Sequence, residues 1–174
     1  MKTSTFALIL GIAYLLIGVM GLVPLFLVPP PIDAPATHFT LLYGYLLGLF
    51  PVNLLHSVLH IAIGALGISA SSGRINPIRY ARDVAIAFGV LAIMGMFPGL
   101  NTVMGIMPVY GHDVWLHGLT AAVAAYFGWR EPISAKDRRN ILGDRRQRML
   151  PISRERRFGL ADRREGFGSM APGF

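Results

Sequence analysis

The chain has 174 residues, of which 53% are hydrophobic and only 14% are charged, and its mean hydropathy is +0.54. Soluble domains carry charge on about a quarter of their residues, so this composition excludes an ordinary soluble domain and indicates a single membrane domain. The chain contains no cysteine, which excludes disulfides, thiolate chemistry and cysteine-ligated zinc or iron–sulfur sites.

Four apolar runs are expected to form membrane-spanning helices, and they cover residues 6–28, 51–70, 84–98 and 114–129. A bilayer core requires about 20 apolar residues in a helix, so the third run is expected to extend by a turn or more on either side. The first run is long, follows only Lys2 and lacks a small-x-small cleavage site, so we expect a retained helix rather than a signal peptide. The expected fold is an all-α bundle of four transmembrane helices.

The charges of the connecting segments predict the orientation. The connection between the second and third runs carries Arg74, Arg79 and Arg82, whereas the other two connections carry no Lys or Arg. Positively charged connections remain in the cytoplasm, so both chain termini are expected there as well. Within the longer outer connection, residues 41–50 are expected to form a short helix on the outer surface.

Two segments match without a gap and indicate an internal repeat. Residues 48–60 and 105–117 share Gly, Pro, Val, Leu and His at equivalent positions, and the preceding run in each half ends in Met-Gly-x-x-Pro. Two helices per repeat return the chain to its starting side of the membrane. The halves are therefore expected to be parallel and related by a pseudo-twofold axis along the membrane normal.

The histidines are the strongest indication of chemistry. His60 and His117 are equivalent in the repeat, and His56 lies one helical turn before His60 on the same face. A polar ring in hydrocarbon needs a partner. His60 and His117 could ligate a haem or chlorophyll-type macrocycle, or together with His56 they could ligate a metal. Alternatively, His60 and His117 form structural hydrogen bonds to Asn53, Ser57 or backbone carbonyls. We favour the structural role. The sequence contains no zinc signature such as His-Glu-x-x-His, so no metal site is expected.

Asp113 is the only acidic residue near the second histidine segment, and it has two compatible roles. Four residues before His117, its carboxylate can accept a proton from the ring, fix the tautomer or relay protons. As the N-cap of the fourth helix, it would instead accept backbone N–H bonds. We favour the cap and expect Asn53 and Asp113 to form an intramembrane polar network.

Small residues in every run are expected to let the helices approach closely, among them Gly11, Gly18, Gly64, Gly67, Gly89 and Gly118.

The C-terminal segment differs sharply from the rest. Residues 130–174 hold twelve of the sixteen basic groups, in repeated Asp-Arg-Arg units that favour bidentate contacts with carboxylate or phosphate. We therefore predict a transmembrane domain over 1–130 and a basic cytoplasmic tail over 131–174, which contacts anionic lipids or other integral membrane proteins. No nucleic-acid partner is expected, because the aromatic spacing of RNA-binding modules is missing. The expected contact residues are Arg138, Arg139, Arg145, Arg146, Arg156, Arg157, Arg163 and Arg164.

The histidine motif resembles a bacterial membrane family described only as domain of unknown function 4383. The resemblance lies in Val52, Asn53, His56, His60 and Gly64, in the Arg-Tyr-Ala stretch at 79–81, and in Asp113 with His117, and it covers roughly residues 6–129. It implies a four-helix membrane fold and assigns no activity. The expected location is a bacterial inner membrane or an internal membrane such as the thylakoid.

Three functions remain open at the level of sequence. The one we favour is a small integral membrane subunit or scaffold whose basic tail docks on a larger membrane complex. The second is a haem- or chlorophyll-binding protein that uses His60 and His117. The third is a small proton-linked transporter that uses the three histidines and Asp113. An enzyme is not expected, because no nucleophile–base set, phosphate-binding loop or paired acids are recognisable.

Overall fold

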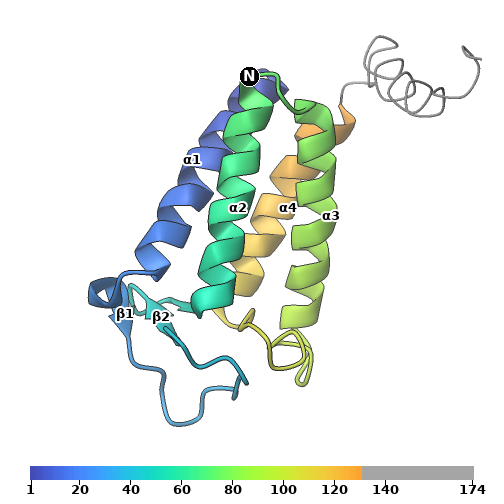
Figure 1. Ribbon diagram of the computed structural model, residues 1–174. Coiled ribbons are helices and arrows are strands. Elements are labelled where there is room, and N and C mark those ends of the chain that lie inside the picture. Colours follow the sequence, from blue (N-terminus) through green and yellow to red (C-terminus); the bar gives the residue numbers. More distant parts are fainter. Residues whose placement is uncertain (131–174) are drawn as a thin grey trace, which may run out of the picture. The chain divides into compact units, whose positions relative to one another are not determined.

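The computed structural model describes residues 1–130. The predicted tail, with every arginine contact expected there, lies outside the described residues. Within the described part, four helices lie side by side as a bundle (Figure 1). These are α1 (Thr3–Gly21), α2 (Leu54–Ser71), α3 (Pro77–Gly95) and α4 (His112–Trp129). The predicted extension of the third run is confirmed at its beginning, because α3 begins at Pro77, and is wrong at its end, because α3 ends at Gly95, before residue 98.

The helices pack as two pairs, α1 with α2 and α3 with α4. The predicted close approach at glycines is found between α1 and α2. A Cβ added at Gly64 would lie 2.7 Å from the Gly11 carbonyl oxygen and 2.8 Å from the Leu15 Cα. In the other pair, Gly89 and Gly118 have only alanine methyl groups nearby, at 3.8 and 3.9 Å. The glycines of the second pair are therefore not required for close packing at these two points.

One end of the bundle carries the basic residues and brings the beginning of α1 close to the end of α4. Asn76 caps α3 by accepting hydrogen bonds from two backbone N–H groups. Arg82 donates from Nε to the Gly128 carbonyl at 2.7 Å, and Arg130 donates to the Met1 carbonyl at 3.0 Å. We call this end the basic end.

The opposite end, here called the sheet end, carries a small antiparallel sheet in the order β1-β2-β3 (Figure 1). The helix expected over 41–50 is wrong, because this stretch contains strands and a turn. Leu47 and Gly48 have φ angles of 54° and 73°, which reverse the chain, and Pro51 then contributes to a strand without a backbone N–H. The elements are η1 (Pro24–Phe26), β1 (Leu27–Val28), β2 (Gly44–Leu46) and β3 (Phe50–Val52).

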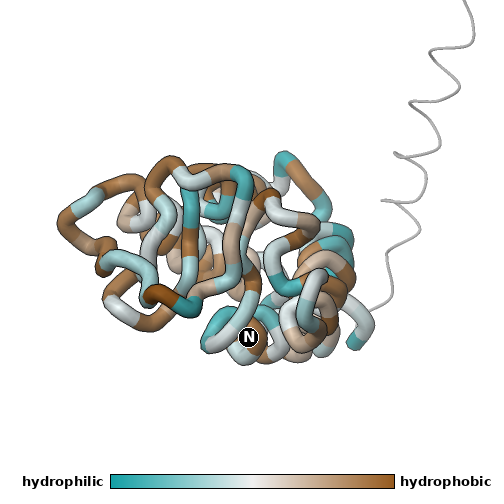
Figure 2. The backbone as a smooth tube through the Cα atoms, turned by 90° about the horizontal axis from the view of Figure 1, so that it is seen from below, coloured by the Kyte–Doolittle hydropathy of each residue, from teal (hydrophilic) through white to brown (hydrophobic). Residues whose placement is uncertain are grey.

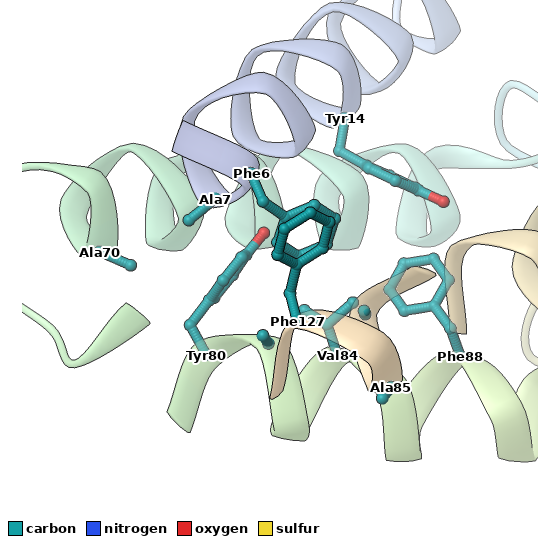
Figure 3. Close-up of a cluster of buried hydrophobic side chains, with 11 residues drawn as sticks. Phe6, Ala7, Tyr14, Ala70, Tyr80, Val84, Ala85, Phe88 and Phe127 are labelled. Carbon is teal, nitrogen blue, oxygen red and sulfur yellow. The ribbon is translucent and has the colours of Figure 1, made fainter. Parts of the chain in front are cut away.

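Seen from the sheet end, the connections mix hydrophilic and hydrophobic segments (Figure 2). The apolar core contains side chains from all four helices (Figure 3). Phe6 of α1 stacks on Phe127 of α4 with ring centroids 4.6 Å apart, and Tyr80 of α3 donates a hydrogen bond to the Ile63 carbonyl of α2. All four helices therefore share one apolar core.

Two of the four helices, α1 and α2, are long and apolar enough to cross a membrane by length and composition. Helix α3 carries Arg79, Arg82 and Asp83, and α4 carries two histidines and Asp113, which lowers the hydropathy of both. The described residues thus form a mostly helical structure of four helices with two candidate spans.

Candidate functional site

Four buried polar side chains meet between α2 and α4, near the sheet end of the bundle. His56 and His60 lie one turn apart at the beginning of α2, and Asp113 and His117 lie one turn apart at the beginning of α4. Each of the four residues is at most 3% exposed. The structure therefore brings together all three histidines and the acid that the sequence singled out.

Asn53 positions the α2 side of this cluster. Its Oδ1 atom accepts a hydrogen bond from the His56 backbone N–H at 3.0 Å, which makes it the N-cap of α2. Its Nδ2 atom donates to the carbonyls of Phe39 at 3.1 Å and Ile106 at 2.8 Å. The fully buried amide thus fixes where α2 begins and ties the helix to two separate connections of the sheet end.

Asp113 is not the N-cap of α4, so that prediction is wrong. Gly111 occupies the cap position with a φ of 64°, and the helix begins at His112, which places Asp113 in the first turn. Its buried carboxylate instead faces α2, with Oδ2 3.7 Å from His56 Nδ1. The acid therefore approaches His56 across the bundle, a pairing that the four-residue spacing to His117 did not suggest.

The three imidazole rings form a compact triangle. The ring centroids are 4.4 Å apart for His56 and His60, 5.8 Å for His56 and His117, and 6.1 Å for His60 and His117. One nitrogen from each ring lies within 4.8 Å of the other two. This is the kind of arrangement in which three imidazoles can share one ion.

The polar atoms of the cluster have no hydrogen-bond partner among the described residues. This holds for both nitrogens of each of the three histidines, both carboxylate oxygens of Asp113 and the Ser57 hydroxyl. The carbonyls of Pro51 and Pro108 lie beside His56 without forming a hydrogen bond of normal geometry. The structural hydrogen bonds that we favoured for the histidines are therefore not formed, and burial of so many unpaired groups requires another explanation.

Aromatic side chains of α1 and α3 close the other sides of the cluster. Tyr14 meets His60 edge-on at 5.0 Å, and Phe88 meets His117 edge-on at 4.9 Å. The Tyr14 hydroxyl shares a hydrogen bond of 2.7 Å with Thr120, which fixes the ring in place. His56, Tyr14 and Phe88 therefore lie against the His60 and His117 rings.

A chain of tyrosine hydroxyls at the sheet end was missed by the sequence reading. Tyr45 donates to Tyr110 at 3.1 Å, the Tyr110 and Tyr43 hydroxyls lie 2.7 Å apart, and Tyr43 donates to the Pro35 carbonyl at 2.8 Å. Burial and the two neighbouring hydroxyls raise the pKa of Tyr110. The repeat alignment could have pointed to Tyr110, because it places this residue opposite Asn53. The Asn53 side chain also joins separate connections of the sheet end.

Comparison with known proteins gives a family and no activity. Neither the curated proteins nor the solved structures provide a match to the chain. A family model described as Domain of unknown function (DUF4383) matches residues 4–130, a range that includes the whole buried cluster. The resemblance inferred from the histidine motif is thereby confirmed. The chain belongs to the family described as Domain of unknown function (DUF4383).

Proposed function

We propose that this is an integral membrane protein in which all four helices cross the bilayer. The observation that carries the proposal is the inverted distribution of side chains, with polar groups buried and large apolar groups exposed on every helix. Such a surface is unfavourable in water and favourable in lipid. The exposed apolar side chains include Ile9, Ile12, Leu16 and Val19 on α1, Val58, Leu59 and Leu66 on α2, Ile86, Val90 and Ile93 on α3, and Leu119 and Val123 on α4.

The charges of α3 are compatible with a spanning helix because they lie at its end. Arg79, Arg82 and Asp83 all fall within the first two turns, at the basic end. Arg79 lies 3.8 Å from Asp83, and Arg82 lies over the ring of Trp129, 5.5 Å from its centroid. Charged and aromatic groups of this kind belong at the interface between lipid and water, so they leave the hydrocarbon-facing part of α3 apolar.

We propose that the basic end faces the cytoplasm. Among the described residues, this end carries Lys2, Arg74, Arg79, Arg82 and Arg130, whereas the connections 29–50 and 99–112 contain no Lys or Arg. The positive-inside rule then assigns the N-terminus and the end of α4 to the cytoplasm, in a bacterial inner membrane or an internal membrane such as the thylakoid.

The proposed parallel repeat is supported by equivalent positions with equivalent environments. Gly48 and Gly105 have φ angles of 73° and 83°. Val52 and Val109, four residues farther along each half, are 1% and 0% exposed. A pseudo-twofold axis along the membrane normal would produce such matched pairs.

The role we propose is that of a non-catalytic subunit or scaffold in a larger membrane complex. Exposed apolar helix faces can pack against other spanning helices as well as against lipid. The arginine-rich segment over 131–174 supplies the docking element, because Asp-Arg-Arg units with interspersed Ile, Leu and Phe suit a mixed protein surface better than a purely anionic one.

Single cysteines test the topology directly, since the chain has none of its own. Ala36→Cys lies in an exposed part of the sheet end, and Ser72→Cys lies in the exposed connection after α2. A membrane-impermeant maleimide added to intact cells is expected to label Ala36→Cys only, and both variants after lysis. Labelling of Ser72→Cys alone in intact cells would reverse the orientation, and labelling of both would remove the spanning arrangement.

The docking role predicts an effect of two arginines in the full-length chain. Arg145→Ala combined with Arg146→Ala is expected to weaken association with a larger complex in native gels at low salt, and the difference from the wild type is expected to shrink as salt is raised, because salt screens the contacts that the wild type makes. Arg145→Lys with Arg146→Lys is the matched control for charge, because lysine keeps the charge but loses bidentate bonding. Unchanged co-migration of both double variants would leave the tail as a topology signal only.

A further inference from the structure

We infer that His56, His60 and His117 form a binding site for one zinc-class transition-metal ion, with Asp113 as its charge-balancing and positioning partner. This inference departs from the sequence-based expectation that no metal site is present. It goes beyond the proposed scaffold role and does not depend on it, because it stands on the geometry of the buried cluster alone.

The donor atoms are already gathered. One nitrogen from each of the three rings lies within 4.8 Å of the others. Zinc–nitrogen bonds of about 2.0–2.1 Å place tetrahedral ligand nitrogens roughly 3.3 Å apart, so modest rotation of the rings is enough to close the site. An all-imidazole donor set suits zinc, copper, nickel and iron(II) rather than magnesium or calcium.

The unpaired state of these atoms is the second observation. A buried neutral imidazole normally engages its N–H and its lone pair with partners. None of the six ring nitrogens has a partner of normal hydrogen-bond geometry among the described residues, and only His56 has backbone carbonyls beside it, those of Pro51 and Pro108. The three histidines are nevertheless only 2%, 3% and 0% exposed. A shared cation would accept one lone pair from each ring and so account for three buried polar groups at once.

Asp113 supplies the negative charge that a buried cation requires. Its Oδ2 atom lies 3.7 Å from His56 Nδ1, and both carboxylate oxygens are otherwise unpaired. His56 would then bind the metal through Nε2 while Nδ1–H turns toward the carboxylate. Carboxylate–histidine–metal arrangements of this kind fix the tautomer and orientation of the ligand ring.

The ion would also link the two helix pairs. His56 and His60 belong to the α1–α2 pair, whereas His117 belongs to the α3–α4 pair, and each helix packs mainly within its own pair. Tyr14 of α1 packs against His60, and Phe88 of α3 packs against His117, so all four helices contribute side chains to the site. We therefore expect the metal to stabilise the assembled bundle in addition to occupying the site.

The test uses the full-length protein, purified in detergent with a tag that lacks histidine and from zinc-depleted medium. Zinc titration followed by calorimetry and metal analysis is expected to give one ion per chain and a raised melting temperature. His60→Gln and His117→Gln are expected to lower zinc affinity by more than about 100-fold. His112→Gln is the matched control on α4, because His112 is exposed and lies outside the cluster, and it should bind as the wild type does.

Two further readouts keep the proposal testable if a ligand variant fails to fold. Cobalt(II) bound to the wild type is expected to show the intense visible bands of a four-coordinate site, with three imidazoles and one water as ligands, whereas the weak bands of a six-coordinate ion would overturn the assignment. Asp113→Asn is expected to keep one ion per chain but to bind it about 10–100-fold more weakly. A folded, metal-free wild type that takes up less than one zinc per chain, or a His117→Gln variant with wild-type affinity, would also overturn it.

Discussion

Replacement of Gly64 by alanine is expected to lower the free energy of unfolding by about 2–3 kcal/mol, because the new methyl group overpacks a rigid contact. The added Cβ would lie 2.7 Å from the Gly11 carbonyl oxygen and 2.8 Å from the Leu15 Cα, and these are backbone atoms of α1. No side chain at this contact can rotate away, so α1 and α2 must separate. Because Gly64 lies one turn beyond His60 on the same face of α2, the shift is also expected to reach the buried histidine cluster.

Gly118→Ala is the matched control for this change. It introduces the same methyl group into α4, where the nearest atom would be the Ala92 Cβ at 3.9 Å. Alanine is favoured over glycine in a helix by about 1 kcal/mol, so this variant is expected to be as stable as the wild type or more stable. Thermal unfolding in detergent, followed by far-UV circular dichroism, compares the two. Equal melting temperatures for both variants would contradict the close contact between α1 and α2.

Replacement of Asn53 by alanine is expected to lower the free energy of unfolding by about 3–7 kcal/mol. Loss of an N-cap costs about 1 kcal/mol, and each buried carbonyl left without its donor adds about 1–3 kcal/mol. The two carbonyls belong to Phe39 and Ile106, so the variant releases both connections of the sheet end from α2 at the same time.

Asn76→Ala serves as the comparison for capping alone. Asn76 accepts hydrogen bonds from the Ile78 and Arg79 N–H groups at the beginning of α3, and its side chain makes no bond to a distant connection among those described. Its loss is expected to cost only about 1 kcal/mol. Urea denaturation of both variants in detergent measures the difference, and a cost for Asn53→Ala no larger than that for Asn76→Ala would show that the two tertiary bonds contribute nothing.

Local patterns were enough to predict the helices and the composition of the site. Apolar runs long enough for a helix and the i, i+4 spacing of His56 and His60 are visible within short stretches of sequence. The equivalence of His60 and His117 follows from aligning two such stretches. The sequence alone therefore determined the family, the four helices and the three histidines that form the buried cluster. It misplaced residues 41–50, where positive φ angles at Leu42 and Leu47 allow the turns that separate short strands.

Only the tertiary structure decided which polar groups meet. The sequence predicted Asp113 as a helix cap, but the cap is Gly111, so α4 begins two residues earlier than expected and the Asp113 carboxylate faces His56. Periodicity also does not show that Tyr14 and Phe88 pack against the histidines. Distances across a bundle depend on how closely the helices approach, and this depends on contacts such as that between Gly11 and Gly64. Sequence spacing specifies positions along one helix, whereas a binding site depends on distances between helices.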